Sequence, residues 1–166
     1  MSAAQIRPFE PEDIEAYHRI RSHPQVAREL LEPPLLSLAE RRNLVAPSPG
    51  ERYLVAERNG EVVGAGELRL YAGRRKHVGH IGLAVHPDHW GQGVGSELMR
   101  ALIELGEGWY GLRRIELKVF ADNRRAIALY EDHGFVVEAT HHDFALLDGE
   151  LATALSMARL KDGSAA

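Results

Sequence analysis

Residues 81–96 read IGLAVHPDHWGQGVGS: an apolar run, a short polar turn and then a glycine-rich segment. The apolar run at 81–85 predicts a strand, and the pattern Glu97-Leu98-Met99 predicts the start of a helix. Where a strand leads through glycines into a helix, free backbone N–H groups and the positive end of the helix dipole point at one spot, and glycine lets an anion come close. The stretch therefore predicts a binding site for a phosphate or pyrophosphate group.

Two common nucleotide-binding motifs match this glycine segment poorly. A P-loop requires a lysine after its second glycine, and no lysine lies between Gly91 and Arg100. A dinucleotide-binding loop requires a third glycine, but counting from Gly91 or Gly93 places Ser96 or Leu98 at that position. Both interpretations are therefore weak.

Outward from this stretch, the chain alternates between patterns typical of strands and of helices. Predicted strands cover residues 4–9, 53–58, 61–70, 76–85, 115–120, 135–147 and 151–160. Predicted helices begin at Pro11 and cover 24–31, 95–107 and 123–133, with one further turn near 38–42. Asn59-Gly60 and Asp148-Gly149 predict hairpin turns, and Gly134 predicts a left-handed helix cap. This order predicts an α+β fold with a mixed sheet, in a single domain over residues 1–166 with its core at about 4–160.

Length and composition are those of one ordinary globular domain. A chain of 166 residues can bury one core, and two full domains are not expected. Its 45% hydrophobic and 27% charged residues argue against a disordered chain. The formal net charge of −4 weighs against nucleic acid as a partner, and no apolar run reaches membrane-spanning length. Residues 1–15 lack the features of a secretory signal, so we expect a cytoplasmic protein.

Cysteine and histidine usage bears on metals and covalent chemistry. The chain has no cysteine, which excludes disulfides, thiolate metal sites and an enzyme-bound thioester. It has nine histidines, but a metal site needs three or four ligands that converge. His141 and His142 are adjacent, so in a strand they point to opposite faces. We therefore expect no metal site.

A second motif lies further along the chain. Asn123 follows a predicted strand, Tyr130 lies two turns into the next predicted helix, and Gly134-Phe135 end that helix. Together the two motifs resemble the GCN5-related N-acetyltransferase (GNAT) superfamily, over nearly the whole chain. Residues 90–95 match its pattern Arg/Gln-x-x-Gly-x-Gly/Ala, except that Trp90 stands at the first position. Within the superfamily, the sequence looks closest to bacterial amino-acid N-acetyltransferases.

The resemblance implies a GNAT fold, which is a mixed, mostly antiparallel twisted sheet of about seven strands flanked by helices. It also implies acetyl-CoA as the co-substrate. The backbone amides that would hold its pyrophosphate belong to Gly91, Gln92, Gly93, Val94, Gly95 and Ser96. In relatives, the preceding strand splays from the next strand and pairs with the pantetheine arm, a role that falls here on Leu83, Ala84 and Val85. A strand amide near Leu83 would polarise the thioester carbonyl.

The resemblance assigns roles to the second motif as well. It implies that Tyr130 protonates the departing thiolate, since a positioned phenol can serve as an acid; an ordinary core tyrosine is the alternative. It implies that Asn123 contacts the cofactor or an ordered water, and a plain helix cap is the alternative. Arg124 and Arg125 either meet the 3′-phosphate or adenine of coenzyme A or lie on a solvated helix face.

The general base stays open at this point. The attacking amine must first lose a proton, because an ammonium cannot attack. Several relatives have a glutamate where this chain has Lys118. Glu116 and His80 are weak candidates, because each is more often a surface residue. The absence of cysteine favours direct attack within a ternary complex.

We therefore expect an acetyl-CoA-dependent N-acetyltransferase that acts on a small primary amine, with the α-amino group of a free amino acid as the best candidate. A protein N-terminus, a polyamine or an antibiotic are alternative acceptors. A coenzyme A-binding module without turnover is the alternative from another class. Residues 17–45 and the final hairpin are expected to shape the acceptor side, and a homodimer through the late strands is left open.

Overall fold

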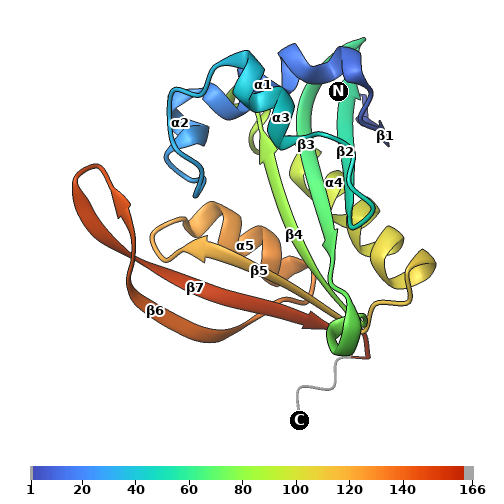
Figure 1. The fold of residues 1–166 in the computed structure, drawn as a ribbon, viewed down its shortest axis with the longest axis vertical. Coiled ribbons are helices and arrows are strands. Elements are labelled where there is room, and N and C mark those ends of the chain that lie inside the picture. The colour runs from blue at the N-terminus through green and yellow to red at the C-terminus, as the bar shows by residue number, and fades with distance from the viewer. Residues whose placement is uncertain (1, 163–166) are drawn as a thin grey trace.

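The computed structural model describes residues 2–162, which form a seven-stranded sheet in the order β1-β2-β3-β4-β5-β7-β6 (Figure 1). The strands are β1 (Gln5–Pro8), β2 (Glu51–Arg58), β3 (Glu61–Leu70), β4 (Val78–Val85), β5 (Arg114–Phe120), β6 (Val136–Leu147) and β7 (Glu150–Leu160). The helices are α1 (Ile14–Ser22), α2 (Pro24–Ala27), α3 (Leu38–Leu44), α4 (Val94–Glu104) and α5 (Arg124–Asp132). Neighbouring strands are antiparallel except β4 and β5, which are parallel. The predicted α+β fold with a mixed, mostly antiparallel sheet is confirmed.

Some predicted boundaries were wrong. The helix predicted from Pro11 begins as a 3₁₀ turn and becomes α1 only at Ile14. The helix predicted over 24–31 ends at Ala27, because the following turn directs Glu32 toward two arginines on α1 and α3. The ends of the predicted domain, residue 1 and residues 163–166, lie outside the described residues.

The helices cover the two faces of the sheet. α4 and α5 pack on one face in a cluster that includes Met99, Leu102 and Tyr130, while α1 and α2 pack on the other in a cluster that includes Ile20 and Val26. Gly66 allows α4 to approach closely, since a Cβ there would come within 2.7 Å of a Leu102 methyl carbon. No helix within residues 2–162 is long and apolar enough to span a membrane.

The central feature of the sheet is the separation of β4 from β5. The two strands pair only at Val78↔Arg114, Gly79↔Ile115 and His80↔Glu116. Beyond that point they diverge, β4 toward β3 and α1, and β5 toward β7 (Figure 1). The sheet is therefore open on one side of β4, next to the turn that leads into α4.

Candidate active site

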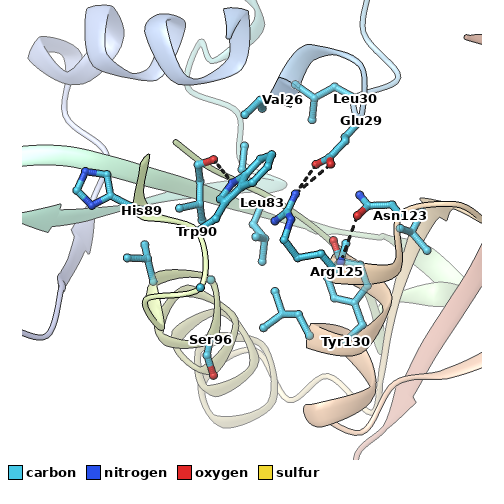
Figure 2. A pocket seen from close by; sticks show the side chains of 18 of the residues that line it. Val26, Glu29, Leu30, Leu83, His89, Trp90, Ser96, Asn123, Arg125 and Tyr130 are labelled. Atoms are coloured by element: carbon cyan, nitrogen blue, oxygen red, sulfur yellow. Dashed lines mark hydrogen bonds and ion pairs between the residues drawn. The ribbon is translucent and has the colours of Figure 1, made fainter. Parts of the chain in front are cut away.

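A cavity lies where β4 and β5 separate, and it joins the two sequence motifs (Figure 2). Its walls come from the segment at α2, from β4, from the glycine loop, which we define as residues 91–96, and from β5 and α5. The lining residues are Val26, Glu29, Leu30, Leu83, Ala84, Val85, His89, Trp90, Gly91, Gly93, Val94, Gly95, Ser96, Lys118, Val119, Asn123, Arg125, Ala126, Leu129 and Tyr130. Of the residues assigned to cofactor binding from the sequence, only Gln92 does not line it.

The glycine loop has the backbone geometry of an anion site. Gly91 and Gly93 have φ values of 69° and 86°, which favour glycine, and Gly93 precedes the first turn of α4. No side chain caps this helix, so the N–H groups of its first turn point into the loop. Gly95 has a packing role, because a Cβ there would lie 3.1 Å from a Leu129 methyl carbon.

Gln92 stabilises the glycine loop through contacts outside the cavity. Its Oε1 accepts a hydrogen bond from Arg58 at 2.8 Å, and its Nε2 donates to the Asp88 carbonyl at 2.9 Å. Both polar atoms of the side chain are therefore engaged within the protein. Its contribution to the site is to hold the shape of the glycine loop.

The backbone of β4 faces the opening with unpaired groups. Tyr71 N–H donates to the Val78 carbonyl and His86 N–H donates to the Val63 carbonyl, so the even-numbered residues of β4 bond to β3. Because alternate residues in a strand direct their backbone groups to opposite sides, those of Leu83 and Val85 point toward β5. The Val85 carbonyl accepts a hydrogen bond from the Trp90 indole at 2.8 Å. Leu83 lies beyond the last β4–β5 pair, which leaves its N–H and carbonyl available to a ligand.

Asn123 and Tyr130 lie on the opposite wall. Asn123 Oδ1 accepts a hydrogen bond from Ala126 N–H at 3.2 Å, so it does cap α5, and its side chain also lines the cavity. Tyr130 is 8% exposed, and burial together with the charge of Glu29 raises the pKa of its phenol to about 12. The phenol is therefore protonated at neutral pH, which is the form that can donate a proton.

The two base candidates from the sequence lie on the α1 face of the sheet, outside the cavity lining. Burial raises the pKa of Glu116, but hydrogen bonds from Arg114 at 2.7 Å and Arg75 at 2.6 Å outweigh it and lower that pKa overall. Burial, with the charges of Arg69 and Lys118, lowers the pKa of His80 to about 4. Glu116 is therefore tied up in ion pairs, and His80 is a weak base.

Glu67 is a candidate that sequence reasoning missed. Like the two base candidates from the sequence, it lies on the α1 face, outside the cavity lining; it is half-buried and in register with Tyr53 on β2 and Gly82 on β4. A Cβ at Gly82 would come within 3.1 Å of Glu67 Oε1, so glycine leaves room for the carboxylate beside β4. Within residues 2–162 this carboxylate has no hydrogen bond or ion pair. The available signal was an acid inside the apolar run VVGAGEL at 62–68.

Arg125 crosses the cavity between three elements (Figure 2). Its guanidinium carbon lies 3.6 Å from the centroid of the Trp90 ring, and its Nη2 donates to both carboxylate oxygens of Glu29. Both Arg124 and Arg125 are exposed and line a neighbouring hollow with Asp122 and Leu147, but only Arg125 also lines the cavity. The two adjacent arginines therefore have different environments. A potential metal site, with three or more clustered histidine or carboxylate side chains, is not found in the described part of the chain.

Comparisons with known proteins agree with this geometry. A profile of the acetyltransferase (GNAT) family matches residues 14–135. The chain is 39% identical to the L-amino acid N-acetyltransferase AaaT of Escherichia coli (strain K12), over 97% of this chain and 100% of that protein. It is 26% identical to the spermidine N(1)-acetyltransferase of the same organism, over 93% of this chain and 84% of that protein. The crystal structure of spermidine N-acetyltransferase from Vibrio cholerae in complex with CoA and spermine superposes with a TM-score of 0.88, at 23% identity and 98% coverage of both chains.

Proposed function

The chain belongs to the acetyltransferase (GNAT) family, and we propose that it transfers the acetyl group of acetyl-CoA to the α-amino group of a free amino acid. The observation that carries the proposal is a single cavity that unites an anion-binding glycine loop, unpaired β4 backbone and a buried, protonated phenol. The 39% identity to an L-amino acid N-acetyltransferase, over nearly the full length of both chains, supports this choice of acceptor.

Each wall of the cavity fits one part of the donor. The N–H groups that begin α4 suit the pyrophosphate, and the unpaired backbone of Leu83 suits an amide of the pantetheine arm. In this arrangement the Leu83 N–H is the hydrogen-bond donor to the thioester oxygen. It stabilises the negative charge that develops there as the amine attacks.

The chemical step is a direct displacement. The amine nitrogen forms a bond to the acetyl carbon, the carbon–sulfur bond breaks, and the Tyr130 hydroxyl gives its proton to the departing sulfur. The amine must lose its own proton before attack, and Glu67 suits this role because its carboxylate lies beside β4 without an internal partner. This places the acceptor on the α1 face of the sheet.

A polyamine is the second candidate acceptor, because the chain is 26% identical to a spermidine N(1)-acetyltransferase. A homodimer is a further proposal. It is supported by β6, which is the last strand of the sheet and exposes Val136 and Val137. Light scattering on the purified protein measures its oligomeric state, and a monomer at all concentrations would contradict the dimer.

Thiol release from acetyl-CoA, measured with a panel of L-amino acids, spermidine, N-terminal peptides and an aminoglycoside, tests the proposed function. We expect release with one or more amino acids, and a large loss of that rate in Glu67→Gln. Release with spermidine alone would move the assignment to the polyamine class. Tight binding of coenzyme A with no release for any amine would support a binding module without turnover.

A further inference from the structure

The Arg125 side chain connects two walls of the cavity (Figure 2). It starts from the first turn of α5, stacks on Trp90 and pairs with Glu29, which follows α2. Trp90 is itself fixed, because its indole N–H donates to the Val85 carbonyl at 2.8 Å. The guanidinium is therefore held beside the glycine loop, one residue from Gly91.

Part of this guanidinium is available for a second anion. An arginine has five N–H donors, and the hydrogen bonds to Glu29, at 3.0 and 2.9 Å, use only Nη2. Within residues 2–162, Nε and Nη1 of Arg125 have no hydrogen-bond acceptor. A phosphate group on the glycine loop would lie close to these donors, and it would compete with the Glu29 carboxylate for the same cation.

The strengths of the two pairings favour the phosphate. The side chains of Arg125 and Glu29 are 44% and 26% exposed, and ion pairs that reach water to this extent are weak. A phosphate offers more negative charge and can accept two parallel hydrogen bonds from the planar guanidinium. Stacking on Trp90 can persist while the hydrogen-bond partner changes.

We propose that Arg125 is a phosphate ligand for the acetyl donor, and that donor binding transfers its hydrogen bonds from Glu29 to a donor phosphate. This inference rests on the proposed function, because it presumes coenzyme A in this cavity. The exchange also affects the segment at α2, where Glu29 lines the cavity together with Val26 and Leu30. Donor binding leaves the Glu29 carboxylate unpaired there, so the donor changes the charge of the wall beside the acceptor.

Binding of coenzyme A, measured by calorimetry, tests this exchange through a double-mutant cycle of Glu29→Gln and Arg125→Gln. We expect Arg125→Gln to weaken binding about tenfold, because charged hydrogen bonds to a phosphate are lost. Glu29→Gln should tighten binding about two- to fivefold, because the competing carboxylate is removed. In the Arg125→Gln background, Glu29→Gln should have no effect. Pantetheine, which lacks phosphates, should bind all four proteins equally.

Arg19→Gln is the matched control, since Arg19 on α1 forms a partly exposed ion pair with Glu61 on β3, and neither residue lines the cavity. It should bind coenzyme A like the wild type. If Arg125→Gln does not fold, Arg125→Lys replaces it and should show a smaller loss, because lysine keeps the charge without the planar fork.

Two results would overturn the inference while leaving the proposed function intact. In one, the wild type binds coenzyme A and Arg125→Gln binds it equally well. In the other, Glu29→Gln weakens binding, which would mean that the Arg125–Glu29 pair persists over the bound donor. A wild-type protein that does not bind coenzyme A at all would overturn both the inference and the proposed function.

Discussion

Two regions beside β4, the glycine-loop side and the α1–α3 side, are built by different means, and of the second only the segment at α2 lines the cavity. The glycine-loop side consists of residues 91–96, the end of β4 and the start of α5, and its binding groups are mainly backbone N–H and carbonyl groups. The α1–α3 side consists of helices α1 to α3 and the turns between them, and its structure depends on charged side chains. Glu32, for example, bridges Arg21 and the buried Arg41. The first side fits groups that every acetyl donor shares, whereas the second can differ from one acceptor to another.

The largest effect is expected at Tyr130, on the α5 wall of the cavity. Tyr130→Phe keeps the ring in the core but removes the proton donor, so kcat should fall about 10²- to 10⁴-fold. The KM for acetyl-CoA should change little, because the backbone groups and the Arg125 side chain proposed to bind the donor are unchanged. Steady-state thiol release measures both constants. Unchanged kcat in a folded Tyr130→Phe protein would mean that this tyrosine is only a core residue.

The α1–α3 side should be sensitive to loss of a single charge. Glu32→Gln leaves Arg41, which is 2% exposed, without its counter-ion, and this should lower the free energy of unfolding by about 3 kcal/mol. Urea denaturation measures the change. Glu61→Gln is the control, because its pair with Arg19 is exposed and should contribute less than about 1 kcal/mol. Equal stability of the two variants would contradict the structural role of Glu32.

His80 should make stability depend on pH on the acid side. Burial, Arg69 and Lys118 lower its pKa in the folded protein to about 4, from an ordinary value of 6.5. Between these values the unfolded chain binds more protons, so the free energy of unfolding falls as pH falls from 6.5 toward 4, by on the order of 2 kcal/mol. His80→Gln should remove this part of the loss. Denaturation curves of the wild type and the variant at pH 7 and pH 4.5 measure this decrease in the free energy of unfolding. An equal decrease in both proteins would contradict the expectation.

The glycine-loop side should be sensitive to backbone geometry. Gly93→Ala introduces a Cβ at a φ of 86°, which strains the turn that precedes α4 and should weaken coenzyme A binding about tenfold. Gly108→Ala is the control, because a Cβ there meets no atom within 4 Å and its φ is not positive. Calorimetry measures both affinities. Equal affinities would show that the loop does not need this conformation.

The contrast between the sides also explains what the sequence could predict. The left-handed turn at Asn59-Gly60 and the left-handed Gly134 depend on neighbouring residues, and both were predicted correctly; the cap at Asn123 was the alternative to its predicted cofactor contact. The divergence of β4 from β5 came from the family resemblance, because local patterns do not reveal how strands pair. The residues predicted to bind the donor line one cavity, except Gln92, whose side chain is bonded to Arg58; their roles stay predictions.

Contacts between distant residues could not be predicted. Glu29 and Arg125 are 96 positions apart, and nothing local to either residue indicates the other. Glu67 becomes a candidate only when the register places it opposite Gly82. Contacts between distant residues also account for the short α2. The hydrogen bonds of Glu32 with Arg21 and Arg41 favour a turn where the local pattern favours a helix. The acceptor therefore remains the least predictable part of the function.

The position of the acetyl group is the most direct test of the account. In ¹⁵N-labelled protein, coenzyme A and acetyl-CoA differ only by the acetyl group, so the amides that distinguish the two ligands are those near it. We predict that the Leu83 amide, whose N–H faces the opening between β4 and β5, shows the largest difference in chemical shift. Leu83 shifts that are equal for both ligands, with the largest differences elsewhere, would contradict the proposed active site.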